Sequence, residues 1–227
     1  SEFVSTVAHQ LRTPLSAIKW TLDILLKDAT AGSLSIDQKA LLMKAYESNE
    51  RIINLIRDML GIDRIESGMF GFSFIEISII DLINNILEEF ASQINRRNIT
   101  VSVKSPEGLP KISVDPQKMR AVLQNLIENA LKYTKEGGTL SLELHVEGDK
   151  MKIVVADNGI GIPKEQQADI FKRFFRAENA KAVDPEGSGL GLFIVRTIIN
   201  RHGGDMTFES EPGKGTKFFL TLPLHHT

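Results

Sequence analysis

Hydrophobic positions in the first third of the chain recur at alternating intervals of three and four residues. They form two series, one within residues 2–30 and the other within residues 36–66. This spacing puts one apolar stripe along each of two α-helices. Ser35 and Gln38 have the spacing of a capping box at the start of the second helix. The pattern therefore predicts a helical hairpin over residues 1–68.

A hairpin of this length cannot cover both of its apolar stripes. Roughly 65 residues bury too small a fraction of their surface to form a good core alone. Two such hairpins can pack as a four-helix bundle, so we expect a homodimer. Asn49 lies within the stripe of the second helix. A buried asparagine can set the register of a bundle, and an exposed position at the edge of the stripe is the alternative.

After Gly68 the pattern changes to short alternating segments interspersed with helical ones. Period-two alternation and short apolar runs predict strands at about residues 72–77, 99–104, 112–114, 139–146, 151–156, 205–210 and 217–222. Helical periodicity predicts helices at about residues 79–96, 116–133 and 189–202. Together these elements predict an α/β sandwich, one mixed sheet backed by helices on one face. We expect two domains, 1–68 and 69–227, with a hinge near residues 68–71.

Composition and charge restrict the classes of function. The 227 residues are 42% hydrophobic and 25% charged, as in ordinary globular proteins, and the formal net charge is -2. This balance provides no basic face, so nucleic acid is not an expected partner. The chain has no cysteine, which excludes disulfides and thiolate metal sites and favours a reducing compartment.

No segment of the sequence is expected to enter a membrane. A membrane-spanning helix needs an apolar run of about 18 residues or more, and the chain has neither such a run nor a signal peptide. The chain begins at Ser1, without methionine and already within a motif. We therefore expect a cytoplasmic portion of a longer protein, with any membrane anchor in segments outside this sequence.

His9 lies on the side of the first predicted helix that is opposite the apolar stripe. Its neighbours on that side, by helical rotation, are Ser5, Thr13 and Ser16. Pro14 lies inside the helical pattern, where it removes a backbone hydrogen bond. A solvent-facing histidine can act as a nucleophile or proton carrier. A surface histidine without function is the alternative that periodicity alone favours.

Three polar or glycine-rich clusters lie at the ends of elements in the second predicted domain. The first shares one face of the helix predicted at 116–133 and comprises Asn125, Asn129, Lys132 and, at the edge, Tyr133. Amide oxygens suit Mg²⁺, and a lysine one turn further on can neutralise phosphate charge. A polar outer helix face is the alternative when this cluster is considered alone.

The other two clusters contain several glycines. The second, residues 157–162, follows a predicted strand and includes Gly159 and Gly161. Its aspartate can accept a hydrogen bond from an exocyclic amine such as that of adenine, and its glycines allow a flat ring to approach closely. The third, residues 187–192, precedes a predicted helix, whose N-terminal amides can bind an anion.

The phosphoacceptor box of sensor histidine kinases, usually written H-E-L-R-T-P-L, resembles residues 9–15, which read H-Q-L-R-T-P-L. The three later clusters resemble, in order and spacing, the ATP-binding domain of the same kinases. The fold of that domain is shared with gyrase, a heat-shock chaperone and a mismatch-repair ATPase. Residues 170–176 match the phenylalanine-bearing box of the family. The resemblance extends over essentially the whole chain.

The resemblance implies a site for ATP and Mg²⁺ in the second domain. Asn129 would coordinate Mg²⁺ with support from Asn125, and Asp157 would recognise adenine. The other residues implied to bind the nucleotide are Lys132, Tyr133, Gly159, Gly161, Ile162, Arg176, Gly187, Ser188, Gly189, Leu190 and Gly191. Lys132 and Arg176 would touch the phosphates. The segment from Gly159 to Ser188 would include a mobile lid.

In the first domain the resemblance implies catalytic roles for His9, Gln10, Arg12 and Thr13. His9 would accept a phosphoryl group from ATP and pass it to an aspartate in the receiver domain of a response regulator. The family normally has an acid where this chain has Gln10. An amide can orient the imidazole but cannot take up a proton, so we expect slow autophosphorylation. Thr13 matches the position that helps to dephosphorylate the regulator, so phosphatase activity is also expected.

Two other functions remain open from the sequence. A phosphatase-biased or nucleotide-sensing scaffold of the same fold is favoured by Gln10. An ATPase of the gyrase or chaperone class would use an acid to activate water, and Glu128 is the candidate. The histidine-bearing hairpin is not expected in that class, so a protein histidine kinase, a phosphotransferase, is the preferred interpretation.

Overall fold

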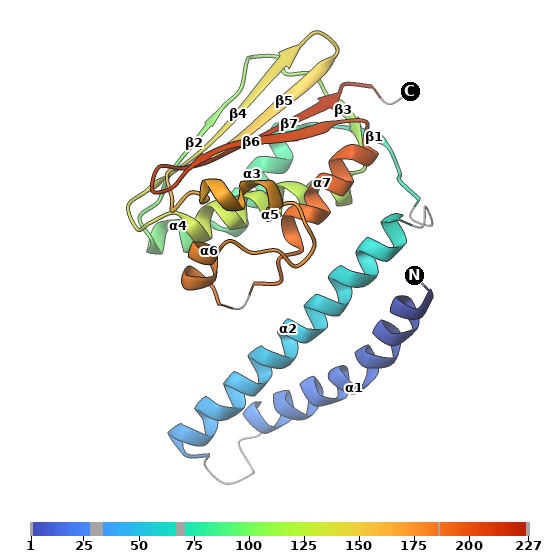
Figure 1. Ribbon diagram of the computed structural model, residues 1–227, viewed down its shortest axis with the longest axis vertical. Helices are drawn as coiled ribbons and strands as arrows, with labels where there is room; N and C mark the ends of the chain where they lie inside the picture. The colour runs from blue at the N-terminus through green and yellow to red at the C-terminus, as the bar shows by residue number, and fades with distance from the viewer. Residues whose placement is uncertain (1, 28–33, 67–70, 186, 226–227) are drawn as a thin grey trace. The chain divides into compact units, whose positions relative to one another are not determined.

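The computed structural model describes residues 2–27, 34–66, 71–185 and 187–225 (Figure 1). The chain divides into two compact units, Ser1–Gly71 and Phe72–Thr227. The hinge expected at residues 68–71 lies almost wholly outside the described residues.

The first unit consists of two helices, as predicted. α1 (Glu2–Lys27) continues through Pro14, and α2 (Ile36–Glu66) begins directly after the expected cap. The capping box is confirmed, because the Ser35 N–H donates to Gln38 Oε1 at 2.9 Å and the Gln38 N–H donates to Ser35 Oγ at 3.1 Å.

A small set of contacts fixes α1 against α2. Asn49 is only 5% exposed, and its Nδ2 donates to the main-chain oxygen of Leu15 at 2.9 Å. Leu15 also packs against the buried Ile56. Lys19 forms an ion pair with Glu50 at 2.9 Å. The exposed-edge alternative for Asn49 is therefore wrong, and its amide links the two helices of the hairpin. Its role in the register of a bundle stays a prediction.

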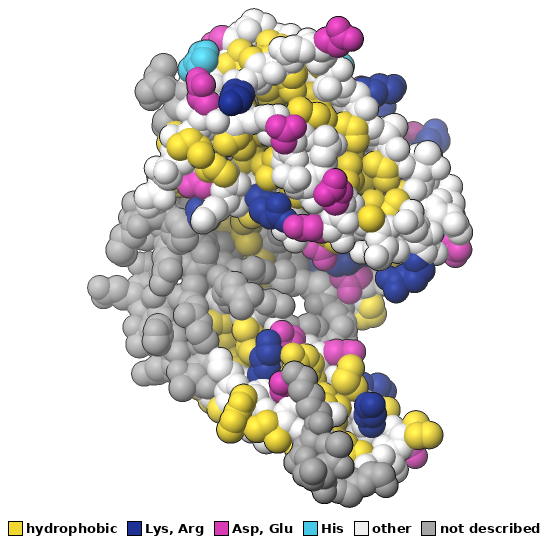
Figure 2. Space-filling view, turned by 180° about the vertical axis from the view of Figure 1, so that it is seen from behind, with side chains coloured by type: hydrophobic (Ala, Val, Ile, Leu, Met, Phe, Trp, Pro, Cys, Tyr) yellow, Lys and Arg dark blue, Asp and Glu magenta, His cyan; other side chains and the backbone are white. Residues whose placement is uncertain are grey.

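Many large hydrophobic side chains remain exposed on this unit. They come from both helices and comprise Leu11, Ile18, Trp20, Ile24, Leu25, Ile36, Leu41, Met43 and Ile52. Hydrophobic side chains are coloured yellow in Figure 2, where the described surface also carries interspersed charges of both signs. Full burial of one such side chain stabilises by about 1.5–3 kcal/mol. A second hairpin would bury this surface, and the four-helix bundle stays a prediction.

The second unit is built on a five-stranded mixed sheet with the order β2-β4-β5-β7-β6. Its strands are β2 (Thr100–Lys104), β4 (Thr139–Glu147), β5 (Lys150–Asp157), β6 (Asp205–Glu211) and β7 (Gly215–Pro223). β2 runs parallel to β4, and the other neighbouring strands are antiparallel. The predicted strand positions are confirmed to within two residues at these ends.

Helices cover one face of this sheet, namely α3 (Ile79–Glu89), α5 (Pro116–Tyr133) and α7 (Gly191–Arg201). The unit also contains the short helices α4 (Ala91–Arg96) and α6 (Glu178–Val183), neither of which has a buried residue. Figure 1 shows α3, α5 and α7 on the same side of the sheet, which confirms the predicted sandwich. The core lies between the two layers, and its buried side chains include Ile83, Leu126, Leu142, Ile153 and Val195.

The start of the second unit is anchored by the buried His202 at the end of α7. The Asp115 N–H donates to His202 Nε2 at 3.0 Å, and Nδ1 donates to the main-chain oxygen of Ile198 at 2.8 Å. Both nitrogens are thereby used by a neutral imidazole with its proton on Nδ1. The rings of Phe72 and Phe74 pack edge-on against it, each with a centroid separation of 5.2 Å. This cluster ties the first residues of the unit to α5 and α7.

Three details of the predicted fold are wrong. The helix expected over residues 79–96 is interrupted at Phe90, where φ is −90° and ψ is 1°. The short strands β1 (Ile75–Ile77) and β3 (Ile112–Val114) form a separate two-stranded antiparallel sheet. Residues 157–188, over which the periodicity predicts no helix or strand, contain α6 and the 3₁₀ helix η1 (Lys164–Asp169). Periodicity reports which residues are buried, whereas strand pairing and short helices depend on the path of the chain.

Candidate functional site

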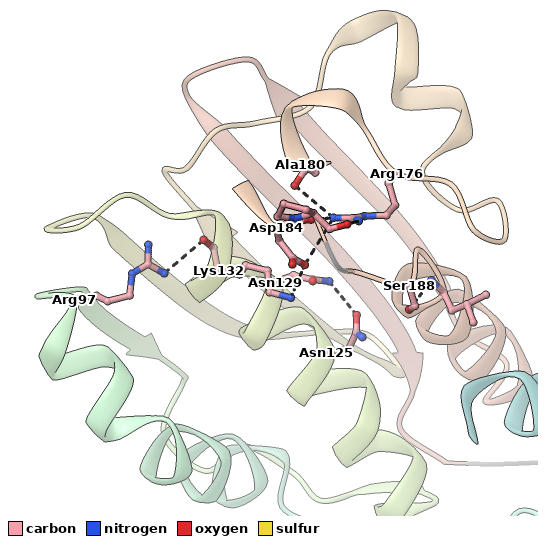
Figure 3. A network of polar contacts seen from close by, with 10 residues as sticks. Arg97, Asn125, Asn129, Lys132, Arg176, Ala180, Asp184 and Ser188 are labelled. Atoms are coloured by element: carbon pink, nitrogen blue, oxygen red, sulfur yellow. Dashed lines mark hydrogen bonds and ion pairs between the residues drawn. The ribbon is translucent and has the colours of Figure 1, made fainter. Parts of the chain in front are cut away.

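Helix α5 carries the first predicted cluster, and both of its ends are held by side chains. At the N-terminus Asp115 Oδ1 accepts a hydrogen bond from the Lys118 N–H at 3.0 Å. At the C-terminus the Arg97 guanidinium donates to the main-chain oxygens of Leu131 and Thr134. Figure 3 shows it beside Lys132, whose main-chain oxygen lies 3.5 Å from Arg97 Nη1. A cation at this end also interacts favourably with the helix dipole. The sequence analysis did not identify Arg97, because its partners lie more than thirty residues away.

The two asparagines of α5 form a pair that faces the start of α7. Asn129 Nδ2 donates to Asn125 Oδ1 at 3.0 Å (Figure 3). This bond orients the Asn129 amide so that its oxygen points away from Asn125. A Cβ atom at Gly191 would lie 2.4 Å from Asn125 Nδ2, so a larger residue at the start of α7 would displace the Asn125 amide. The structure thus brings together residues of the first and third clusters.

The second cluster lies next to the C-terminal end of α5. The Ile160 N–H donates to the Tyr133 main-chain oxygen at 3.2 Å. A Cβ atom at Gly159 would lie 2.3 Å from that oxygen, and one at Gly161 would lie 2.1 Å from the main-chain oxygen of Glu211. Gly161 also has a φ of +64°. Close approach of backbone to backbone therefore requires both glycines.

Asp157 ends strand β5 beside these glycines and is partly buried. Its Oδ1 accepts a hydrogen bond from the Gly159 N–H at 2.8 Å. Burial raises the pKa of the Asp157 carboxyl to about 6, while hydrogen bonds from the main chain of Gly159 and Thr216 act in the opposite direction. Ile162 is held nearby, because its N–H donates to Ser210 Oγ at 2.9 Å.

Arg176 and Lys132 are brought together by an acid that the sequence analysis missed. Asp184 Oδ2 lies 3.2 Å from Lys132 Nζ (Figure 3). The Arg176 guanidinium donates to the main-chain oxygens of Pro185, at 2.9 Å, and of Asp184. No motif marks Asp184, and 52 residues separate it from Lys132. Only the folded chain could reveal this contact.

The third cluster connects this segment to α7. Ser188 Oγ accepts a hydrogen bond from the Leu190 N–H at 3.2 Å, and Leu190 is buried. Gly189 has a φ of +69°, and a Cβ atom there would lie 2.7 Å from the carbonyl carbon of Phe174. No side chain among the described residues caps α7 at its first residue, Gly191. Its N-terminal amides are suited to an anion.

The residues predicted to act in the first unit lie on α1. They are His9, Gln10, Arg12 and Thr13, whose side chains lie outside the described part of the structure. Their roles stay predictions. Among the described helices, none is both long and apolar enough to cross a membrane.

Comparison with known proteins identifies the family. A model of the His Kinase A (phospho-acceptor) domain matches residues 1–68. A model of the histidine kinase-, DNA gyrase B-, and HSP90-like ATPase matches residues 114–226. The chain belongs to the sensor histidine kinases. The family resemblance of the phosphoacceptor box and of the three later clusters is thereby confirmed.

Individual relatives agree with this assignment. The histidine kinase chain is 35% identical to sensor histidine kinase WalK of Bacillus subtilis, over 98% of the chain and 36% of WalK. It is 33% identical to the alginate biosynthesis sensor protein KinB of Pseudomonas aeruginosa, over 99% of the chain and 37% of KinB. The chain therefore spans little more than a third of the length of these relatives.

Solved structures of histidine kinases have the same fold. Full-length ShkA in complex with AMPPNP matches all of this chain and 46% of its own, with a TM-score of 0.82 and 26% identity. The catalytic domain of ThkA matches 67% of this chain and 97% of its own, with a TM-score of 0.60 and 28% identity. The predicted fold class is thereby confirmed.

Proposed function

We propose that this histidine kinase core binds ATP in its second unit and phosphorylates His9. The observation that carries the proposal is that three separate motifs meet around α5. Asn125 packs against Gly191, and the Tyr133 main chain packs against Gly159. In this proposal residues 1–68 are the dimerisation and phosphoacceptor domain, and residues 69–227 are the catalytic ATP-binding domain.

The residues around α5 fit the chemical groups of a nucleotide. The partly buried carboxylate of Asp157 accepts a hydrogen bond from the adenine amine. Lys132 and Arg176 contact the phosphates. Tyr133, Gly159, Gly161 and Ile162 line the nucleotide, and the segment of Gly187, Ser188, Gly189, Leu190 and Gly191 closes over the phosphates. The AMPPNP complex of ShkA supports this assignment, because ShkA resembles the chain over its whole length.

Asn129 is the residue proposed to hold Mg²⁺. Its amide nitrogen is engaged by Asn125, which leaves the oxygen as the group directed to the metal. When bound, Mg²⁺ would neutralise charge on the phosphates. The described residues contain no group of three or more His, Asp or Glu side chains that could hold a metal by themselves. A site of this kind relies on phosphate oxygens as well.

His9 is the proposed nucleophile. A neutral imidazole has a ring nitrogen with a free lone pair, which can attack the terminal phosphorus of ATP directly. Gln10 accepts a hydrogen bond from the other ring N–H and orients it, and Arg12 completes the phosphoacceptor box. Because an amide cannot act as a base, the assistance that an acid supplies, typically about 10²- to 10⁴-fold, is absent. The expected autophosphorylation is correspondingly slow.

The proposed partners are a second copy of the chain and a response regulator. The exposed hydrophobic side chains of the first unit support a four-helix bundle between two copies. The receiver domain of the regulator would take the phosphoryl group from His9 on an aspartate. Thr13 would help to position the water that hydrolyses the phosphoaspartate of the regulator and releases inorganic phosphate. The likeness to sensor histidine kinase WalK and to the sensor protein KinB supports this place in two-component signalling. We propose a cytoplasmic location for this part of the protein.

Incubation with γ-labelled ATP and Mg²⁺ tests the proposed activity. We expect label to enter the chain slowly and to be acid-labile and alkali-stable, as a phosphoimidazole is. ATP binding without any labelled protein would contradict the kinase and favour a phosphatase-biased scaffold. Continuous release of inorganic phosphate without labelled protein would instead favour an ATPase in which Glu128 activates water.

The raised pKa of Asp157 predicts a pH dependence of nucleotide binding. The carboxylate form accepts the adenine amine, and it is lost as the pH falls through about 6. We expect the affinity for adenosine to decrease below that pH, approaching about tenfold for each further unit. Adenosine is the probe because it has no phosphate to titrate, and isothermal titration calorimetry between pH 5 and pH 8 measures the change.

The Asp157→Asn variant is the control for this titration. It should bind adenosine weakly at every pH and show no step near pH 6. If the affinity for adenosine depended on pH equally in the original chain and in Asp157→Asn, the proposed recognition of adenine by Asp157 would be contradicted.

The raised pKa also means that charging Asp157 destabilises the folded state. The stability contributed at Asp157 is therefore fully present below the ordinary pKa of 3.8, decreases as the pH rises from 3.8 to about 6, and changes no further above that.

A further inference from the structure

Asp184 places a carboxylate between the two cations that we assign to the nucleotide phosphates. Its Oδ2 lies 3.2 Å from Lys132 Nζ and 3.7 Å from Arg176 Nη2 (Figure 3). The side chains of Asp184, Lys132 and Arg176 are 20%, 34% and 11% exposed. Water and salt therefore screen these contacts less than they screen an ion pair on the open surface.

The backbone of the same segment holds Asp184 in place. The Asp184 N–H donates to the main-chain oxygen of Ala180 at 2.9 Å, at the end of α6. Arg176 donates to the main-chain oxygens of Asp184 and Pro185 on either side of the peptide. A Cβ atom at Gly187 would lie 2.8 Å from Asp184 Oδ2. The carboxylate thus fills the space beside the glycine-rich segment proposed to close over the phosphates.

We propose that Asp184 is an internal anion that occupies the phosphate position and thereby sets the affinity for ATP. The inference rests on the proposed function, because it takes Lys132 and Arg176 as the phosphate-binding cations. Lysine and arginine form charge-assisted hydrogen bonds with carboxylate and phosphate alike. Two anions held by the same cations repel each other. The phosphates of an incoming nucleotide therefore displace the Asp184 side chain.

This displacement opposes the binding of phosphate-bearing nucleotides and leaves adenosine unaffected. Adenosine can contact Asp157, but it has no phosphate group to contact Lys132 or Arg176. Removal of the Asp184 charge is expected to tighten ATP binding by roughly three- to tenfold, the range of a modest coupling between partly exposed charges. The KM for ATP should fall with it. The kcat should change little, because Asp184 has already left the cations when ATP is bound.

Calorimetric titration of the chain with ATP, ADP and adenosine, each with Mg²⁺, tests the proposal. The Asp184→Asn variant removes the charge and nearly preserves the shape. We expect it to bind ATP and ADP more tightly than the original chain and to bind adenosine equally well. The Asp184→Glu variant keeps the charge and should remain near the original affinities.

Glu178→Gln is the matched control, because Glu178 is an exposed acid on α6. It should leave all three affinities unchanged. Thermal unfolding of each variant checks that the fold is retained. Asp184→Ser removes the same charge without adding an amide and takes the place of Asp184→Asn if that variant does not fold.

Several results would overturn the inference. Unchanged or weaker ATP binding by Asp184→Asn would show that the carboxylate does not compete with phosphate. If Asp184→Asn bound adenosine more tightly by the same factor as ATP, Asp184 would affect the conformation of the segment and would not occupy the phosphate position. Either result leaves ATP binding by the chain, and with it the proposed function, intact. Failure of the original chain to bind ATP would reject the proposed function and this inference together.

Discussion

Replacement of His9 by alanine is expected to abolish acid-labile labelling of the chain by γ-labelled ATP. The imidazole is the proposed attacking group, and alanine has no nucleophile to take its place. ATP binding should be unchanged, because the proposed nucleotide site belongs to the second unit, Phe72–Thr227, and His9 to the first. Labelled protein and ATP affinity are measured on the same preparation. Loss of label with retained affinity separates the chemical step from binding.

A variant of a second histidine tests whether the loss of label is specific to His9. His145 is exposed on β4, where its Nε2 lies 3.6 Å from Glu143. The His145→Ala variant should be labelled at the original rate. Retention of acid-labile label in His9→Ala would place the phosphoacceptor elsewhere and contradict the proposal for the first unit.

Replacement of Asn129 by alanine is expected to reduce the rate of autophosphorylation by about 10²-fold or more. Removal of one preorganised group that stabilises a developing charge commonly has an effect of this size. The Asn129→Ala variant loses the oxygen proposed to hold Mg²⁺. Rates of labelling measured over a series of Mg²⁺ concentrations should show that the variant needs more metal than the original chain.

Asn125 and an unrelated asparagine provide the comparison. Asn125 orients the Asn129 amide through the 3.0 Å hydrogen bond, so Asn125→Ala should have a smaller effect of about tenfold. Asn84 is exposed on α3, and Asn84→Ala should not change the rate. If Asn129→Ala autophosphorylated at the rate of the original chain and needed no more Mg²⁺, the proposal that Asn129 holds the metal would be contradicted.

Local motifs of the sequence were sufficient for much of the fold and of the candidate site. The Ser35–Gln38 capping box and the Asp115 cap involve atoms three residues apart, so the sequence contains the whole interaction. The face shared by Asn125 and Asn129 follows from the helical period in the same way. The family resemblance assigned Asn125, Asn129 and Gly191 to one nucleotide site, and in the structure Asn125 lies against Gly191.

Other features could not be predicted, because they join distant parts of the chain. Arg97 holds the end of α5 from 34 residues away, and Asp184 reaches Lys132 from 52 residues away. β1 and β3 pair with each other outside the main sheet. Neither the alternation of a strand nor the charge of an isolated side chain identifies its partner.

The sequence by itself determined the two helices of the first unit, the layers of the second and the residue types suited to a nucleotide. These properties depend on helical and strand periods and on caps within one turn. The tertiary structure alone decided that the Asp184 carboxylate lies between Lys132 and Arg176. It also decided that Gly159 and Gly161 are needed for backbone packing. Such contacts join residues that are far apart in the sequence. They depend on the tertiary fold, which a local sequence pattern does not specify.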